Sequence, residues 1–224
     1  MERSIVVDAH VHFWDPALLH YSWLGSVPEL NRRFLPSDFA PLVSGTVDAV
    51  VFIEANCSPA ECTDEVEFVE RLAATESRIA GTVAFVDLLD ERGRSAALER
   101  LRETNRVVGV RHNIQGHAEG FPLNPTFVRG VREVGEHGLP FDLCLTSDQL
   151  SEVTELVRRC PHTSFVLDHC GKPAIRENAF DRWSLDLAHL AAHDNVCCKL
   201  SGLLTEAHAD QRGDEGLLPY AEHA

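Results

Sequence analysis

Seven short apolar segments, separated mostly by amphipathic ones, constrain the fold of this 224-residue chain more than any other feature of its sequence. Residues 46–54, for example, form a near-continuous apolar run, which is typical of a strand covered on both faces. Buried strands that alternate with amphipathic helices predict a parallel sheet. The predicted strands are, in order, residues 4–12, 46–54, 79–87, 107–112, 139–145, 164–169 and 195–201.

Helical periodicity fills most of the intervals between these strands. The helices predicted there begin near residues 58, 92, 124, 146 and 178. The interval of residues 13–39 is different, because it is long, irregular and rich in aromatic residues. A loop of that length inside a compact domain is usually functional. Its aromatic side chains are expected either to cover a ligand or to plug the end of a barrel.

Two architectures contain parallel strands that alternate with helices: an open doubly wound sheet and a closed (β/α)8 barrel. The open sheet usually carries a glycine-rich phosphate loop after a strand, and no such motif occurs here. We therefore predict an α/β fold of the (β/α)8 TIM-barrel type, formed by a single domain over residues 1–224. Seven of its strands are recognisable, and residues 202–224 contain no eighth strand.

Composition narrows the classes of partner. A hydrophobic content of 44% indicates an ordinary globular protein, and the net charge of −15 argues against nucleic acid as a partner. No apolar run approaches the ~18 residues of a membrane helix, and no signal peptide precedes the first strand, so we expect a cytoplasmic protein without membrane contacts. The seven cysteines lack disulfide or zinc-knuckle spacing and are interpreted as reduced core thiols. The oligomeric state is not predicted.

Polar residues end every predicted strand, and His10 and His12 are the first of them. Side chains alternate along a strand, so these two imidazoles point to the same side. In a (β/α)8 barrel the functional site lies at the carboxyl ends of the strands. Glu54 either belongs to that site or forms a structural ion pair with Arg111. The polar residues at the strand ends are His10, His12, Glu54, Asn56, Asp87, Arg111, His112, Thr146, Asp168, His169, Lys199 and Ser201.

Four ordered motifs make the sequence resemble a known family. They are H-V-H-F-W-D at residues 10–15, G-V-R-H at 109–112, L-D-H-C-G-K-P at 167–173 and K-L-S-G at 199–202. This set resembles the amidohydrolase-2 branch of the amidohydrolase superfamily, and within it the sugar-lactone hydrolases such as the fuconolactonases and rhamnonolactonases. The likeness covers nearly the whole chain. It implies a (β/α)8 barrel and the hydrolysis of a small lactone.

The resemblance also implies roles for single residues. Three histidines would surround the lactone carbonyl as catalytic residues, and the same three would ligate one divalent metal ion, preferably Zn²⁺, where a metal is bound. Members of the family vary in metal dependence, so a metal-independent site is the other interpretation. These histidines are His10, His12 and His169. The predicted substrate-binding residues are Arg111, Lys199, Glu54, Trp14 and His112, and the two cations among them are expected to hold hydroxyl or carboxylate groups.

One family feature is absent from the sequence. The family pattern continues to an eighth strand that ends in G-S-D-W-P, whose aspartate is the proposed general base and, where metal is present, a ligand. Residues 1–224 contain no such segment, so we expect a C-terminally incomplete domain, and the general base is not identified. Three functions follow: a lactone hydrolase that acts through attack of an activated water, a metal-dependent decarboxylase of the same branch, or an inactive truncated barrel.

Overall fold

The computed structural model describes residues 4–43 and 45–224, and the chain divides into two compact units. Unit 1 comprises the described residues up to Asp87 together with Glu99–Arg111, and unit 2 comprises Leu88–Leu98 and His112–Ala224. Helix α3 (Arg94–Glu103) contributes residues to both. Among the described residues, no helix has the length and apolar character needed to cross a bilayer.

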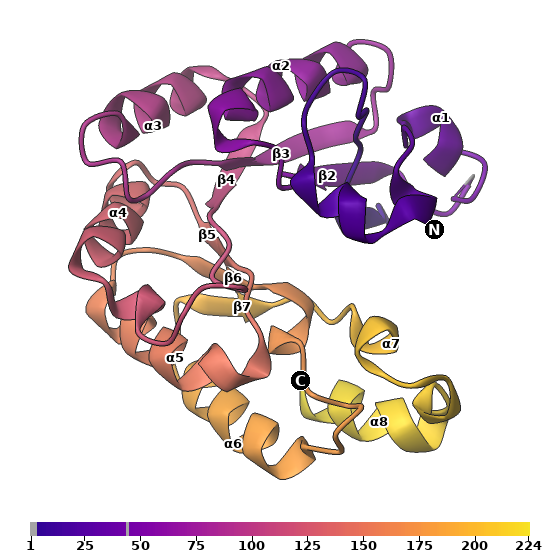
Figure 1. Ribbon diagram of the computed structural model, residues 1–224, viewed down its shortest axis with the longest axis vertical. Helices are drawn as coiled ribbons and strands as arrows, with labels where there is room; N and C mark the ends of the chain where they lie inside the picture. The colour runs from indigo at the N-terminus through magenta and orange to yellow at the C-terminus, as the bar shows by residue number, and fades with distance from the viewer. Residues whose placement is uncertain (1–3, 44) are drawn as a thin grey trace. The chain divides into compact units, whose positions relative to one another are not determined.

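Unit 1 is built on four parallel strands that neighbour one another in chain order (Figure 1). They are β1 (Val7–Val11), β2 (Ala49–Ile53), β3 (Ile79–Phe85) and β4 (Val107–Arg111). Helix α2 (Cys62–Ala73) packs against β3. Phe13 and Phe52 stack with ring centroids 6.3 Å apart, and both are almost fully buried. This aromatic pair anchors the core directly behind the carboxyl ends of β1 and β2.

The aromatic loop after β1 folds back onto this core. It contains the short helix α1 (Pro36–Phe39) and two 3₁₀ helices, and Trp14 pairs with Phe34 through backbone hydrogen bonds. Tyr21 and Leu24 are buried in the core cluster of unit 1. The loop therefore packs on the core of unit 1. Its two predicted roles, covering a ligand and plugging the end of a barrel, stay predictions.

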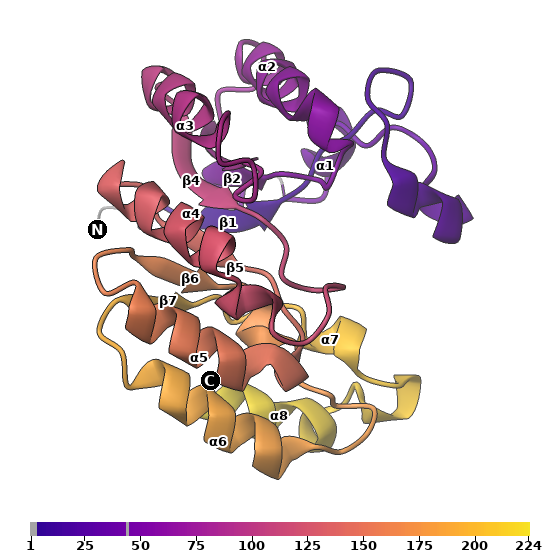
Figure 2. The ribbon, with the colours of Figure 1, turned by 60° about the vertical axis from the view of Figure 1, so that its left-hand side comes forward.

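Unit 2 contains three further parallel strands, each with its helix on one side (Figure 2). The strands are β5 (Phe141–Leu143), β6 (Phe165–Leu167) and β7 (Val196–Cys198). The helices are α4 (Pro125–Glu136), α5 (Leu150–Arg159) and α6 (Phe180–Ala191), of which α5 and α6 pack side by side. Asn124 caps α4, because its side-chain oxygen accepts the Thr126 N–H at 2.8 Å and Pro125 occupies the first helical position.

All seven predicted strands are present, and each is shorter than its apolar run. Several of the predicted polar residues directly follow their strands, namely His12, Glu54, His112, Asp168 and Lys199. His10 instead lies within β1, and Arg111 is the last residue of β4, where it pairs with Phe85 of β3. Residues 202–224 follow the last of these strands. They form α7 (Leu203–Glu206) and α8 (Asp214–His223), and Tyr220 of α8 packs on Trp183 with centroids 5.1 Å apart. Closure into an eight-stranded barrel stays a prediction.

Short 3₁₀ helices occupy several of the connections. They are Ser22–Ser26, Pro28–Leu30, Pro59–Glu61, Phe121–Leu123, Ser147–Gln149 and Ala209–Gln211. The turn Asp168–Gly171 differs from these, because His169 and Cys170 have positive φ angles.

Candidate active site

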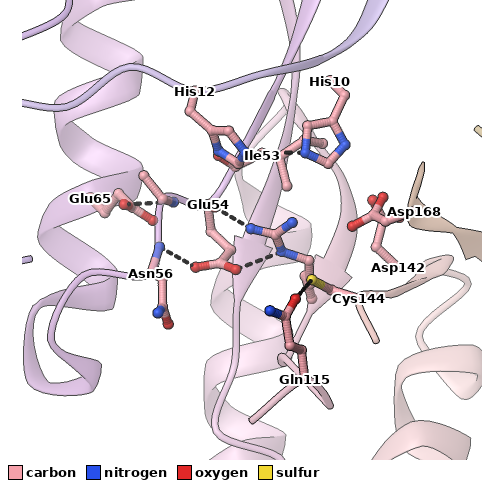
Figure 3. A network of polar contacts seen from close by, with 12 residues as sticks. His10, His12, Ile53, Glu54, Asn56, Glu65, Gln115, Asp142, Cys144 and Asp168 are labelled. Carbon is pink, nitrogen blue, oxygen red and sulfur yellow. Dashed lines mark hydrogen bonds and ion pairs between the residues drawn. The ribbon is translucent and has the colours of Figure 1, made fainter. Parts of the chain in front are cut away.

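The two histidines at the end of β1 converge on one point, as their spacing predicts (Figure 3). Their Nε2 atoms are 3.1 Å apart, and the rings meet edge to face with centroids 4.9 Å apart. His12 Nδ1 lies 2.8 Å from the carbonyl oxygen of Ile53 at the end of β2. A carbonyl can only accept, so Nδ1 of His12 carries the proton and the Nε2 of the neutral ring presents its lone pair to His10.

This donor set fits a divalent metal ion. A backbone carbonyl that orients a histidine through its second ring nitrogen is the usual support for a metal ligand. The Nε2 atoms of His10 and His12, 3.1 Å apart, are the nitrogens through which the two imidazoles would bind such an ion. The pair supplies two ligands. Within residues 4–43 and 45–224, no group of three or more His, Cys, Asp or Glu side chains is arranged to hold a metal ion.

Glu54 follows Ile53, whose carbonyl contacts His12, and it forms a buried ion pair with Arg111. Arg111 Nε donates to Glu54 Oε1 at 2.6 Å, and Arg111 Nη2 donates to the Glu54 backbone oxygen at the same distance. The two side chains are 6% and 1% exposed. The structural ion pair that the sequence left open is thus present. A substrate-binding role for Glu54 or Arg111 stays a prediction.

A second carboxylate, Glu65 of α2, holds the same strand end from the other side. Its Oε1 accepts the Ala55 N–H at 3.1 Å, while Glu54 Oε2 accepts the Asn56 N–H at 2.7 Å (Figure 3). Burial, and then the charge of Glu54, raise the pKa of Glu65 to about 8. Glu65 is therefore a neutral acid at pH 7, which avoids two buried negative charges side by side.

The carboxyl end of β2 thereby fixes two predicted site residues at once. The Ile53 carbonyl sets the tautomer of His12, and the next residue, Glu54, holds Arg111. Trp23 supports this segment, because its indole N–H donates to the Ala55 oxygen at 2.9 Å.

In unit 2, the ammonium of Lys199 is enclosed by two buried carboxylates. Its Nζ lies 2.6 Å from Asp142 Oδ2 and 2.8 Å from Asp168 Oδ1. Lys199 is 13% exposed, and the two carboxylates are 3% and 0% exposed. Because Asp142 lies in β5, Asp168 directly follows β6 and Lys199 directly follows β7, these two ion pairs link the three strands. Asp168 points into this cluster, and substrate contact by Lys199 stays a prediction.

His169 is positioned by the segment that follows β7. Its Nδ1 is hydrogen bonded to Ser201 Oγ at 2.8 Å. Gly202 lies against the same ring: a Cβ placed there would be 2.7 Å from His169 Cβ, and the residue has a φ of +76°. Only glycine fits both requirements without strain. The K-L-S-G motif therefore holds the histidine of the L-D-H-C-G-K-P motif.

The remaining predicted site residues have structural partners of their own. His112 is buried, and its Nδ1 accepts the Leu88 N–H at 3.1 Å, which places the proton of the neutral ring on Nε2. Trp14 is half-buried, and its indole N–H donates to the Leu30 oxygen at 3.2 Å. Contact of either side chain with a substrate stays a prediction.

Sequence reasoning missed two buried acids and one cation. Asp142 is the only charged residue in the apolar run of β5, and this isolation was the available signal. Glu65 lies three and four residues before Phe68 and Val69, which places it on the inner face of α2, whereas the apolar residues Val66 and Leu72 of the same helix are only half-buried. The cation is Lys172 of the L-D-H-C-G-K-P motif, whose ammonium contacts Gln115 and Cys144.

The sequence matches the family described as Amidohydrolase over residues 7–223. This chain belongs to the amidohydrolase family. An L-fucono-1,5-lactonase of Burkholderia multivorans is 35% identical over 216 residues, which are 91% of this chain and 70% of that protein. The L-fucono-1,5-lactonase of Burkholderia ambifaria is 30% identical over 204 residues, 90% of this chain and 69% of that protein.

A solved structure agrees with this membership. The crystal structure of an amidohydrolase from Burkholderia multivorans with bound zinc superposes with a TM-score of 0.82 at 34% identity, covering 97% of this chain and 79% of that one. The α/β fold of seven parallel strands is thus shared with this amidohydrolase structure.

Proposed function

We propose that this chain is a lactonase that opens a sugar aldonolactone or a related small lactone by attack of water on the ring carbonyl. The observation that carries the proposal is the convergence of His10 and His12 at 3.1 Å, with His12 fixed by the Ile53 carbonyl. The family membership and the two lactonase relatives support the reaction class.

In this proposal the imidazoles polarise the reacting oxygens. The reaction needs an electrophilic carbonyl carbon and a water that gives up a proton. Neutral His12 can accept a hydrogen bond only through Nε2, because Nδ1 donates to Ile53. His12 can therefore accept a hydrogen bond from the attacking water, and His10 binds this water or the lactone carbonyl oxygen. His169, held by Ser201, is assigned to the same reaction.

A divalent metal ion would be held by His10, His12 and His169, and it would supply Lewis-acid polarisation and a water of lowered pKa. The overall step forms one C–O bond from water and breaks the ring C–O bond. It yields a hydroxy acid, which releases one proton at neutral pH. None of the described residues is assigned as the general base.

A proton-release assay tests the proposal. Purified protein is mixed with a panel of 1,4- and 1,5-aldonolactones in weak buffer, and acid formation is followed with a pH indicator. The wild type is expected to open at least one lactone faster than buffer. His10→Asn and His169→Ala are expected to lose about 10²- to 10⁴-fold in kcat/KM, the usual contribution of such groups. Exposed His20 provides a matched control, and His20→Asn should retain wild-type turnover.

Two outcomes would overturn the assignment: no lactone opened above the buffer rate, or equal turnover by His169→Ala and wild type. To test metal dependence, the same assay is repeated after chelation and after addition of Zn²⁺, and the bound metal is measured by elemental analysis. Activity lost on chelation, together with CO₂ release from an aromatic acid, would instead indicate the decarboxylase.

A further inference from the structure

Lysine is almost absent from this chain. Of the 20 basic residues only Lys172 and Lys199 are lysines, and the other 18 are arginines. Both follow strands of unit 2 at their carboxyl ends, Lys172 after β6 and Lys199 after β7. The two ammonium groups nevertheless have opposite environments.

Lys199 is neutralised inside the protein by Asp142 and Asp168, as described above. Lys172 contacts only neutral acceptors. Its Nζ forms a short hydrogen bond to Gln115 Oε1 and lies 3.7 Å from Cys144 Sγ. Across residues 4–43 and 45–224, no carboxylate forms an ion pair with Lys172, although the chain carries 35 acidic residues. A half-buried cation without a counter-ion is the feature that an anionic ligand would satisfy.

The backbone that carries Lys172 is unusual. Four consecutive residues, His169, Cys170, Gly171 and Lys172, have positive φ angles of 53°, 54°, 68° and 47°. Left-handed geometry costs about 1–2 kcal/mol for each non-glycine residue. The turn is held by Trp183, whose indole N–H donates to the Cys170 oxygen at 2.8 Å, and by the Cys170 N–H, which donates to the Lys199 oxygen at 3.1 Å.

This left-handed turn mounts two functional groups on one rigid segment. The Lys172 N–H donates to the His169 oxygen at 2.9 Å, so the ammonium and the candidate catalytic imidazole are carried together. Backbone strain of this kind persists where the surrounding structure enforces it, and it concentrates at functional sites.

The partners of Lys172 add further donors. Gln115 turns its amide oxygen toward Lys172, which leaves its NH₂ group to donate to a ligand. The Cys144 thiol lies 4.0 Å from the same oxygen (Figure 3). Gln115 and Cys144 therefore both contact the Lys172 ammonium. An ammonium beside an amide NH₂ offers two neighbouring donors, which matches the two oxygens of a carboxylate.

We propose that Lys172 and Gln115, beside the Cys144 thiol, form a carboxylate-binding subsite. The proposal deepens the lactonase function and rests on it for the source of the carboxylate, which is either the hydroxy-acid product or a carboxyl group carried by the lactone. It also moves the predicted role of an anion-binding lysine from Lys199, which has two internal counter-ions, to Lys172, which has none.

Amine labelling tests the subsite without any turnover, because the only primary amines of this sequence are two lysines and the N-terminus. The protein is reductively methylated with formaldehyde and a borane donor, and peptide masses give the rate at each amine. Lys172 is expected to react faster than the enclosed Lys199. Gluconate, succinate and benzoate serve as carboxylate probes, and at least one should slow Lys172 fivefold or more. Glucitol, which has a CH₂OH group where gluconate has its carboxylate, should not.

Equal labelling of Lys172 with and without all three carboxylates overturns the proposal, as does equal protection by glucitol and gluconate. The Lys199 and N-terminal rates are internal references, because a general effect of the probe would slow all three amines. Since no lactone is turned over, failure here is distinguishable from failure of the proposed reaction.

Kinetics then separates the two sources of the carboxylate. If the product binds at the subsite, Lys172→Met should raise the inhibition constant of the hydroxy acid at least tenfold and leave KM for a neutral lactone unchanged. If the substrate carries the carboxylate, the same variant should raise KM for a carboxylated lactone at least tenfold at similar kcat. Lys172→Arg keeps the charge and should recover most of the loss, and a variant that changes neither constant contradicts both arms.

Discussion

Glu65 is a buried acid whose protonation ties stability to pH. Its folded pKa of about 8 lies above the ordinary glutamate value of 4.5, so between these pH values the folded protein holds one proton more than the unfolded chain. The contribution of this protonated carboxyl to the free energy of unfolding is complete below pH 4.5 and is lost as the pH rises to 8. Glu65→Gln should remove the loss, because the amide keeps an acceptor for Ala55 N–H and does not ionise.

Urea unfolding at pH 5, 6, 7 and 8 measures this effect. The free energy of unfolding of Glu65→Gln relative to wild type should rise with pH by up to about 1.4 kcal/mol per unit. Glu67→Gln removes an exposed carboxylate from the same helix and should give a flat difference. A flat difference for Glu65→Gln as well would show that Glu65 is already ionised in the folded protein.

At the scale of elements, the turn of residues 169–172 depends on the glycine that packs against it. An alanine at Gly202 combines a φ of +76° with a Cβ only 2.7 Å from His169 Cβ. We expect Gly202→Ala to lower the free energy of unfolding by about 2–5 kcal/mol and to reduce turnover by displacing His169. Gly138 has a similar φ of +71° but no neighbour within 4 Å. Gly138→Ala should therefore cost only about 1–2 kcal/mol and preserve turnover.

Equal losses of stability and full activity in both glycine variants would contradict the positioning role of Gly202. The conformational penalty is common to the two variants, so the difference between them isolates the contact with His169. Denaturant unfolding and the proton-release assay provide the two measurements.

Strand positions were predictable because apolar runs mark buried parallel strands whatever surrounds them. The pairing of His10 with His12 followed from strand alternation alone. The left-handed turn was not predictable, since three of its four residues carry side chains that disfavour positive φ. The pairing of Lys199 was hidden for another reason: its partners come from two other strands, and sequence spacing gives no distance between Asp142 and Lys199.

At the scale of the whole molecule, excess negative charge should make stability depend on salt. The formal net charge is −15, and ion pairs on the surface, such as Glu155 with Arg158, stabilise little because water screens them. Repulsion among unpaired carboxylates acts over longer distances and is screened when the Debye length falls from about 30 Å at 0.01 M to about 8 Å at 0.15 M. The buried Lys199 cluster is screened much less.

Relief of repulsion should therefore outweigh the weakening of surface pairs when salt is added. We expect Tm at pH 7.5 to rise by about 2–8 °C between 10 and 200 mM NaCl, equivalent to about 1–2 kcal/mol for a chain of this size. The control is the same titration near pH 5.1, the isoelectric point calculated from the sequence, where the increase should vanish because the net charge does. A Tm that falls with salt at pH 7.5 would mean that surface ion pairs dominate, and an equal rise at both pH values would indicate a salt effect unrelated to net charge.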